Sequence, residues 1–407
     1  MHILIIGAGG VGSAAARIAS RRSFFDKLTI ADYDPARPQG LVTEIGDPRY
    51  TAAQVDASSA DAVEALIRET GATHVLNAVD PRFVMPIFDG AHAAGVTYLD
   101  MAMSLSVRHP EEPFTKTNIK LGDDQFAVAD EWEKKEQLAL VGIGVEPGLS
   151  DIFARYAADE LFDEIDVLSV RDGANLTVEG YEFAPSFSIW TTIEECLNPP
   201  ILWDKDKGGW HAVEPFSDPI TFEFPEGIGE VECVNVEHEE VHLMPRWIDA
   251  KKVEFKYGLG NEFIEVLKTL NKLGLDKTEP VTVRGQQVSP RDLVAAVLPD
   301  PATLGPLMKG KTCAGVLVTG THKDGTKKSL YLYHVADNEE TMARDNSQAV
   351  VWQTAINPVV ALELLANGTW SGAGVLGPEA FDAKPFLELL AAAEPQGYGS
   401  AWGIVER

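Results

Sequence analysis

The chain opens with a glycine-rich turn of the kind that binds a dinucleotide. Residues 2–6 are almost continuously apolar and run directly into the pattern GxGxxG. In this pattern the first glycine permits a tight turn, the second lets the backbone approach a pyrophosphate, and the third lets helix and strand pack closely. The helix that follows offers free N–H groups and the positive end of its dipole to the anion. We expect the pyrophosphate to be bound by Gly7, Gly9, Gly10, Val11 and Gly12.

An acidic residue follows where the adenosine ribose would lie. Asp32 ends the second expected strand, 20 residues after Gly12. A carboxylate at this position binds the two ribose hydroxyls and repels a 2′-phosphate, which favours NAD over NADP. Arg37 could still turn toward a phosphate, so the cofactor prediction is NAD or NADP.

Two further strand ends are expected to reach the cofactor. Asp56 and Ala57 follow the third strand, where the adenine edge usually lies, although Asp56 could instead cap the next helix. Asn77 and Ala78 end the fourth strand, on the side where the nicotinamide ribose would pass. Asn77 could equally cap a loop.

A second motif is a weaker guide to function. Residues 238–242 satisfy HExxH, the zinc-protease pattern, whose chemistry needs a helix that brings both histidines to one metal. Residues 230–243 instead alternate with the period of a strand, on which residues four apart lie roughly 13 Å apart. We therefore expect no metal site here. An imidazole and a carboxylate on a sheet face remain useful as substrate contacts.

The elements that must position these residues fall into two groups. Residues 1–100 alternate short apolar strands with amphipathic helices, which is typical of a parallel sheet with crossover connections, and a sixth strand is expected at 138–143 after a polar, loop-like stretch. After about residue 150 the pattern is β-rich, and 323–326 is a hairpin turn between two strands. Helices are expected at 60–70, 261–273, 290–298 and 347–366. The predicted fold class is α/β, with an N-terminal Rossmann doubly wound parallel sheet and an α+β domain built on a largely antiparallel sheet.

Composition excludes several classes of protein. The 407 residues carry a formal net charge of −28, which repels phosphate backbones and argues against a nucleic-acid partner. We find no apolar run as long as a membrane span and no signal-peptide pattern at the start. The three cysteines form neither a disulfide framework nor a zinc motif. We expect a cytoplasmic protein with no membrane or nucleic-acid partner.

Several stretches after the glycine motif resemble the saccharopine dehydrogenase family, and especially its carboxynorspermidine dehydrogenases. They run in order along nearly the whole chain and are YLD at 98–100, GIGVEPGLSD at 142–151, FPEGIG at 224–229, HEE at 238–240, LPDP at 298–301, GKT at 310–312 and SQA at 347–349. The resemblance implies an NAD(P)-dependent enzyme acting on the CH–NH group of a small amine or amino-acid substrate. In the reductive direction an amine condenses with a carbonyl, and hydride is delivered to the imine carbon. It also implies a homodimer.

The resemblance assigns approximate domains. They are 1–145 for dinucleotide binding, 146–350 for substrate binding, and 351–407 for a C-terminal helical segment that returns to the first domain. Within them we expect proton transfer by Asp100, His238 and Glu239, with His238 titrating near neutrality. Substrate contacts are expected from Glu146, Pro147 and Gly148, which form a rigid turn, although a plain interdomain turn is the alternative. Arg171 and Lys311 could pair with substrate carboxylates, but a surface ion pair is the favoured interpretation of both.

The segment 187–193 departs from the family, because it lacks the basic residue that many relatives carry there and has Trp190 and Thr191 instead. Fewer positive charges suggest a substrate with fewer carboxylates than saccharopine. Two other enzyme classes lack their expected residues. A sugar-type oxidoreductase would usually carry Glu-Lys-Pro after the fifth strand, which is absent, and an aspartate-semialdehyde dehydrogenase would need a reactive cysteine near a histidine, a context that the three cysteines lack. A third function stays open. A non-catalytic NAD(P)-binding redox sensor would need only the glycine motif.

Overall fold

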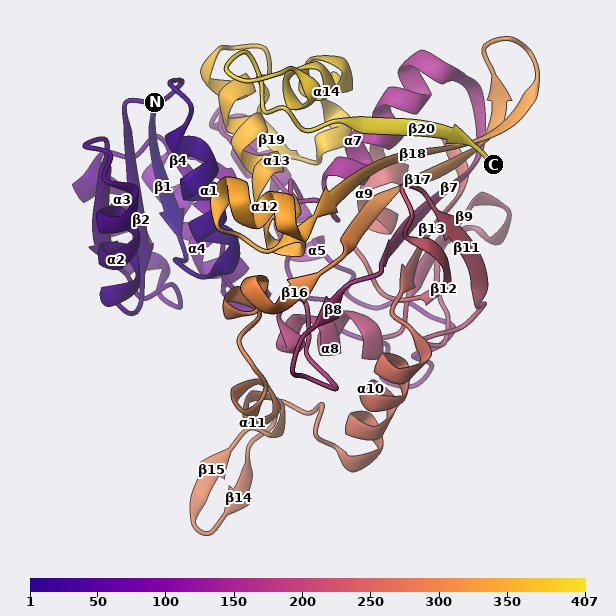
Figure 1. Cartoon of the computed structure of the whole chain (residues 1–407), viewed down its shortest axis with the longest axis horizontal. Helices are drawn as coiled ribbons and strands as arrows, with labels where there is room; N and C mark the ends of the chain where they lie inside the picture. Colours follow the sequence, from indigo (N-terminus) through magenta and orange to yellow (C-terminus); the bar gives the residue numbers. More distant parts are fainter.

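Two large sheets organise the chain in the computed structural model, which describes residues 1–407 (Figure 1). The first sheet is parallel throughout, and its strand order is β19-β6-β5-β4-β1-β2-β3. Its strands are β1 (His2–Ile6), β2 (Lys27–Asp32), β3 (Tyr50–Gln54), β4 (His74–Asn77), β5 (Thr97–Leu99), β6 (Leu138–Leu140) and β19 (Gly374–Leu376). The predicted doubly wound parallel sheet is confirmed.

Helices cover this sheet because its strands are apolar on both faces. Helix α1 carries Ala14, Ala15 and Ala16 fully buried, and such small side chains let it pack closely. Helix α3 begins at Ser59, whose hydroxyl accepts the N–H of Ala62. The helices here are α1 (Gly10–Ser20), α2 (Ala36–Ile45), α3 (Ala60–Thr70), the short turn η1 (Pro81–Phe83), α4 (Val84–Ala94), α5 (Asp123–Phe126) and α6 (Ala129–Lys134).

The second sheet has nine strands and is largely antiparallel, as predicted, with one parallel pair between β13 and β7. Strands β17 and β18 form the predicted hairpin across residues 323–326. The strands are β7 (Phe162–Ala174), β9 (Ile201–Asp204), β10 (Gly209–Ala212), β11 (Ile220–Phe224), β12 (Gly229–Asn235), β13 (Ala250–Gly258), β17 (Lys311–His322), β18 (Lys327–Asp337) and β20 (Trp402–Glu406). Two small ribbons pair β8 (Thr177–Val178) with β16 (Met308–Lys309), and β14 (Val281–Val283) with β15 (Gln286–Val288).

The remaining helices lie along and beside this sheet. They are α7 (Leu149–Tyr156), η2 (Ala157–Leu161), α8 (Ile189–Leu197), η3 (Lys205–Lys207), α9 (Glu240–Trp247), α10 (Asn261–Leu273), α11 (Pro290–Val297), η4 (Pro301–Thr303), η5 (Gly305–Leu307), α12 (Asn338–Asp345), α13 (Ala349–Ala366), η6 (Pro378–Ala380) and α14 (Ala383–Ala391). Figure 1 shows the ribbon β14–β15 projecting from the body of the molecule beyond α10 and α11. The predicted helix at 261–273 has the observed bounds.

One predicted strand is wrong in its second half. Strand β12 ends at Asn235, and helix α9 begins at Glu240, so residues 240–243 are helical rather than extended. Helix α9 is buried on two sides, with Val241 and Met244 in the larger hydrophobic cluster and Leu243 in another. A helix buried on two sides has no single apolar stripe, so its pattern can imitate the period of a strand.

The C-terminal residues belong to both parts of the fold. Strand β19 adds an edge to the parallel sheet next to β6, and β20 adds an edge to the second sheet next to β18. Helix α13 packs against α1. The prediction that no apolar run is as long as a membrane span is wrong for α13, which is long and apolar enough; 78% of it is buried inside this chain, as is usual for a helix of the protein core.

Candidate active site

The main cleft of the molecule has a volume of about 270 Å³ and lies between the parallel sheet and the second sheet. The first domain lines it through Gly10, Val11, Asn77 and Ala78, which is the predicted nucleotide side. Residues from β7, α8, β13 and the loop before α9 line the opposite wall. Ligands bind at the carboxyl ends of the strands in open α/β sheets, and this cleft has that position.

The glycine turn has the geometry that a dinucleotide needs. A Cβ on Gly12 would lie 1.9 Å from the carbonyl oxygen of Gly7, so helix α1 could not pack here with any larger residue. Gly7 has φ +108°, which other residues rarely adopt. A Cβ on Gly9 would meet nothing within 4 Å, so the backbone is open there to an incoming pyrophosphate. The residues present therefore fit a dinucleotide.

The ribose-binding acid is held in place by the same turn. Asp32 accepts the backbone N–H of Ala8 at 2.8 Å through Oδ2 and that of Asp34 at 3.0 Å through Oδ1. The aromatic ring of the next residue, Tyr33, is 73% exposed and unexplained by packing. Such a ring offers an adenine a stacking surface, and nothing in the sequence alone marks Tyr33 as exposed.

Of the other predicted cofactor residues, one pair lines the cleft and the other pair does not. Asn77 and Ala78 line the cleft, and Asn77 also caps a loop by donating to the hydroxyl of Tyr98 at 3.0 Å and accepting the N–H of Val79 at 3.2 Å. Asp56 and Ala57 follow β3, outside the residues that line the cleft. The alternative prediction for Asp56 is wrong, because it accepts from Ser58 and the cap of α3 is Ser59.

Asp100 lies directly after β5, is 1% exposed and lines the cleft. Its Oδ1 accepts the backbone N–H of Gly142 at 2.7 Å, and its Oδ2 accepts from the side-chain amide of Gln125 at 2.8 Å. Burial raises the pKa of Asp100 to about 7, although these two hydrogen bonds act in the opposite direction. A carboxyl group with a pKa near neutrality can both give and take a proton.

His238 is stacked on Phe255, with ring centroids 3.9 Å apart and an interplanar angle of 7°. Its Nδ1 lies 2.6 Å from a carboxylate oxygen of Glu240 and 3.4 Å from one of Glu239. Burial alone would lower the pKa of His238, but these carboxylates outweigh it and raise the pKa to about 10. The prediction that His238 titrates near neutrality is therefore wrong. At neutral pH it is an imidazolium.

Glu239 is 4% exposed and accepts the backbone N–H of Met103 at 3.3 Å. With His238 and Glu240 it forms a cluster whose potential ligand atoms lie within 4.8 Å of one another. An imidazolium has no free lone pair for a metal, so the cluster in this protonation state is an ion-pair network. His238 precedes α9 and His242 lies within it, so the HExxH pattern does not span one helical turn.

The predicted turn at residues 146–148 forms one wall. Glu146 and Pro147 line the cleft, and Glu146 accepts from the hydroxyl of Ser150 at 2.8 Å and the backbone N–H of Gly315 at 3.2 Å. Burial, and then the neighbouring Asp172, raise the pKa of Glu146 well above its usual value. Gly148 has φ +137°, and a Cβ there would lie 2.1 Å from the Gly144 carbonyl oxygen, so this turn needs glycine.

Neither predicted carboxylate-binding cation lines the cleft. Arg171 is 4% exposed and its guanidinium pairs with Glu254 at 3.0 Å. Lys311 lies 4.0 Å from a carboxylate oxygen of Glu226. Both are engaged with acids of the second sheet, so their placement gives no support to substrate contacts.

The strongest feature of the cleft was missed by sequence reasoning. Its lining contains seven carboxylates and no lysine or arginine, and the additional acids are Asp80, Asp172, Glu195 and Asp300. Burial raises the pKa of Asp172 to about 6 and that of Glu195 to about 8. His238 is the one imidazolium among these groups. The cleft therefore suits a cation and disfavours a substrate with several carboxylates.

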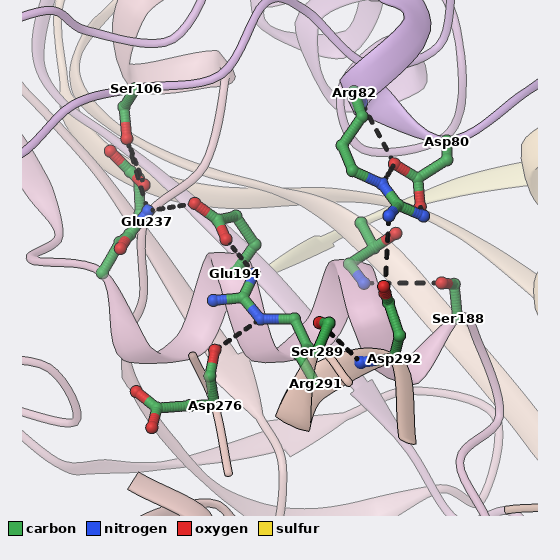
Figure 2. A network of polar contacts seen from close by, with 12 residues as sticks. Asp80, Arg82, Ser106, Ser188, Glu194, Glu237, Asp276, Ser289, Arg291 and Asp292 are labelled. Atoms are coloured by element: carbon green, nitrogen blue, oxygen red, sulfur yellow. Dashed lines mark hydrogen bonds and ion pairs between the residues drawn. The ribbon is translucent and has the colours of Figure 1, made fainter. Parts of the chain in front are cut away.

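Arginines lie close by but do not line the cleft, and their polar contacts are shown in Figure 2. Arg82, from the nucleotide domain, pairs with Asp80 at 2.8 Å and with Asp292 of α11 at 3.4 Å. Arg291 of α11 pairs with Glu194 of α8. Both guanidinium groups pack on Trp190, at 4.3 and 4.7 Å from its ring. The segment that lacks a basic residue is thus fastened by two arginines whose charges are neutralised.

Comparisons with known proteins agree with this architecture. The family described as "Saccharopine dehydrogenase NADP binding domain" matches residues 3–140, and "Saccharopine dehydrogenase C-terminal domain" matches residues 144–394. The chain is 31% identical to a carboxynorspermidine synthase from Vibrio cholerae over 416 residues, covering 100% of this chain and 97% of that protein. It is 29% identical to a carboxyaminopropylagmatine dehydrogenase from Synechocystis sp., covering 95% and 94%.

A solved structure shares the fold. An apo saccharopine dehydrogenase (L-Glu forming) from Saccharomyces cerevisiae matches with a TM-score of 0.68 and 14% identity, covering 100% of this chain and 99% of that one. At this identity the likeness concerns the arrangement of the elements, while the acids that line the cleft come from this chain's own sequence.

Proposed function

Because this chain belongs to the saccharopine dehydrogenase family and is an NAD(P)-dependent oxidoreductase of that type, we propose that it reductively couples a cationic diamine to an aldehyde. The product would be a secondary amine of the carboxynorspermidine kind. The observation that carries the proposal is the lining of the cleft, with seven carboxylates and no lysine or arginine. Opposite charges attract strongly where the wall excludes water, so an amine substrate is favoured over saccharopine, which bears three carboxylates.

The bound dinucleotide supplies hydride, and the chain supplies orientation and proton transfer. Asp100 is the group of the cleft best matched to the proton of a reacting amine, because its pKa of about 7 lets it deprotonate an ammonium and return the proton. His238, an imidazolium at neutral pH, is suited to donate a hydrogen bond to the carbonyl oxygen and a proton to the departing water. Glu239 holds His238 from one side at 3.4 Å.

The turn containing Glu146, Pro147 and Gly148 supports the same assignment. The Oε2 atom of Glu146 is buried and accepts no hydrogen bond, and the side chain shares a hydrogen bond with Asp172 while Glu146 is protonated, so a substrate ammonium could take the place of that shared proton. Asp172 lines the cleft beside it and is coupled to it electrostatically. An amine placed against this pair would hold its nitrogen between two carboxylates. Residues 1–145 would then bind the cofactor, 146–350 the amine, and 351–407 would join the two parts.

We further infer that the chain acts in the cytoplasm as a homodimer. Five of its exposed large apolar side chains are gathered in the segment from the end of α10 to the end of α11, which includes the projecting β14–β15 ribbon: Leu273, Val281, Val283, Leu293 and Val297. A two-stranded ribbon is marginally stable alone and gains from being covered. Light scattering of the purified chain tests this. A mass near 44.2 kDa at all concentrations would contradict the dimer.

The function is tested by following NADH or NADPH absorbance at 340 nm with pairs of substrates. Aspartate semialdehyde would be paired with diaminopropane, putrescine or agmatine, and compared with α-ketoglutarate plus lysine and α-aminoadipate semialdehyde plus glutamate. We expect turnover with an amine that carries no carboxylate and little or none with glutamate. Turnover only with the carboxylate-rich pairs would refute the proposal.

A further inference from the structure

A small side cavity continues the main cleft behind α8, and its volume of about 10 Å³ is room for one water-sized group. It shares Pro81, Thr191, Glu195 and Glu239 with the main cleft, so the two spaces adjoin. Three apolar side chains, Met103, Leu105 and Leu121, form part of its wall. The other wall carries four glutamates, which are Glu194, Glu195, Glu237 and Glu239.

Of these four carboxylates, Glu194 already has a cation. It pairs with Arg291, and its other oxygen accepts from Asn198 at 2.9 Å (Figure 2). Glu237 accepts from neutral groups, the hydroxyl of Ser106 at 2.9 Å and the side chain of Asn198. The Arg291 pair thus anchors α8 from outside, which aims the adjacent residue, Glu195, toward the cleft and the cavity.

Apart from the cation on Glu194, the positive group near these carboxylates is His238. Glu239 is 4% exposed, and its Oε2 has no hydrogen bond but lies 3.4 Å from Nδ1 of His238. The charges that act on Glu195 are His238 and three further acids, Glu237, Glu239 and Glu240. His238 already lies 2.6 Å from Glu240. One imidazolium therefore serves several acids. Burial raises the pKa of Glu195 and that of Glu237 to about 8, so both hold a proton at neutral pH that a bound ammonium could replace.

We propose that this side cavity, formed by Glu195, Glu237 and Glu239, binds the distal, non-reacting primary ammonium of the diamine substrate. The proposal rests on the proposed function. An ammonium is as small as a water molecule and carries three N–H donors, one for each of these carboxylates. The apolar wall would cover the methylene next to it. A guanidinium is planar with three nitrogens and exceeds the cavity, so the site selects a diamine over agmatine.

The test compares amines that share a reacting end. Diaminopropane and propylamine differ only in the distal ammonium, and agmatine ends in a guanidinium. With aspartate semialdehyde and the preferred cofactor, the wild-type kcat/KM should favour diaminopropane over each of the others by about 100-fold or more, as expected for a buried charge pair. Glu195→Gln and Glu237→Gln should each lower the diaminopropane-to-propylamine ratio about tenfold or more. Glu232→Gln, an exposed acid on β12, is the matched control.

A second measurement separates binding from misfolding. Calorimetric titration of the cofactor into each variant should give a Kd within about twofold of wild type, because the nucleotide side of the cleft is unchanged. An unaltered diaminopropane-to-propylamine ratio in Glu195→Gln, or agmatine used as well as diaminopropane, would overturn the subsite and leave the proposed function standing. Absence of turnover by wild type with every amine would instead overturn the proposed function.

Discussion

Replacing Asp100 by asparagine should remove most of the activity. The variant should also be less stable than wild type at low pH and more stable than wild type at high pH. Asp100 is 1% exposed, and burial raises its pKa from the usual 3.8 to about 7. Between these values the unfolded chain loses the proton while the folded chain keeps it, so the wild type loses stability as pH rises from about 4 to about 7. Asparagine has no charge and escapes that loss.

The magnitude follows from the shift and from the hydrogen bonds. A shift of about 3 pKa units corresponds to about 4 kcal/mol at about 1.4 kcal/mol per unit, which is an upper limit for a group of this kind. Asparagine offers one acceptor where Asp100 serves two donors, the Gly142 N–H and the Gln125 amide. The side-chain NH2 of the asparagine would then face the donor that its oxygen does not serve, and this unsatisfied pair would cost about 1–3 kcal/mol of stability. Asp100→Asn should therefore be about 1–3 kcal/mol more stable than wild type at pH 8 and less stable at pH 4.

Urea unfolding at several pH values measures this crossover. Asp163→Asn, an exposed aspartate on β7, is the control and should run parallel to wild type throughout. On the same samples, kcat/KM for the amine should fall about 10²–10⁴-fold in Asp100→Asn, and the inflection near pH 7 should vanish. Stability curves for wild type and Asp100→Asn that stay parallel from pH 4 to pH 8 would refute the reasoning.

Two further variants test the other ends of the cleft. Asp32→Ser removes the carboxylate that repels a 2′-phosphate, so the ratio of kcat/KM for NADPH to that for NADH should rise about tenfold or more, and an unchanged ratio would count against this role. His238→Gln should lower kcat about 100-fold, since the cleft loses its imidazolium. The pKa of His238 is raised from 6.5 to about 10, so the stability that it contributes is fully present below pH 6.5 and is lost as pH rises through 10. Unfolding of His238→Gln should lack that decline, and the same decline in both proteins would contradict it.

The nucleotide domain could be predicted from sequence because its information is local. Each strand is a short apolar run and each helix an amphipathic one, so the expected helix at 60–70 has the observed bounds. The glycine pattern is likewise local, since the closeness of Gly12 to Gly7 follows from one turn. The edge strand β19 could not be predicted, because its three residues become a strand only by pairing with β6, more than 200 residues earlier.

The site was predicted in part for the same reason. Asp100 and Glu146 follow strand ends or turns that sequence can place, and both line the cleft. Glu195 and Asp172 lie inside a helix and a strand, where a lone acid usually means a solvated face. Their inward direction comes from the packing of α8 against α10 and α11, and from the register of β7. A side-chain direction that depends on tertiary packing cannot be predicted from the spacing of residues along the chain.

The distribution of charge around the cleft argues that it is built for a cation rather than merely acidic like the rest of the chain. A net charge of −28 would give any pocket some acids at its rim, where water screens them. Of the seven acids of the cleft, Asp300 is exposed and Asp80 pairs with Arg82. Asp100 and Glu239, in contrast, are almost fully buried, where an ionised carboxylate costs free energy unless a positive group lies beside it. Two arginines lie nearby, but Arg82 already pairs with Asp80 and Asp292, and Arg291 already pairs with Glu194. Selection for stability alone would favour pairing those guanidinium groups with the acids of the cleft. The carboxylates that have no cationic partner therefore point to a positive charge that arrives with the substrate.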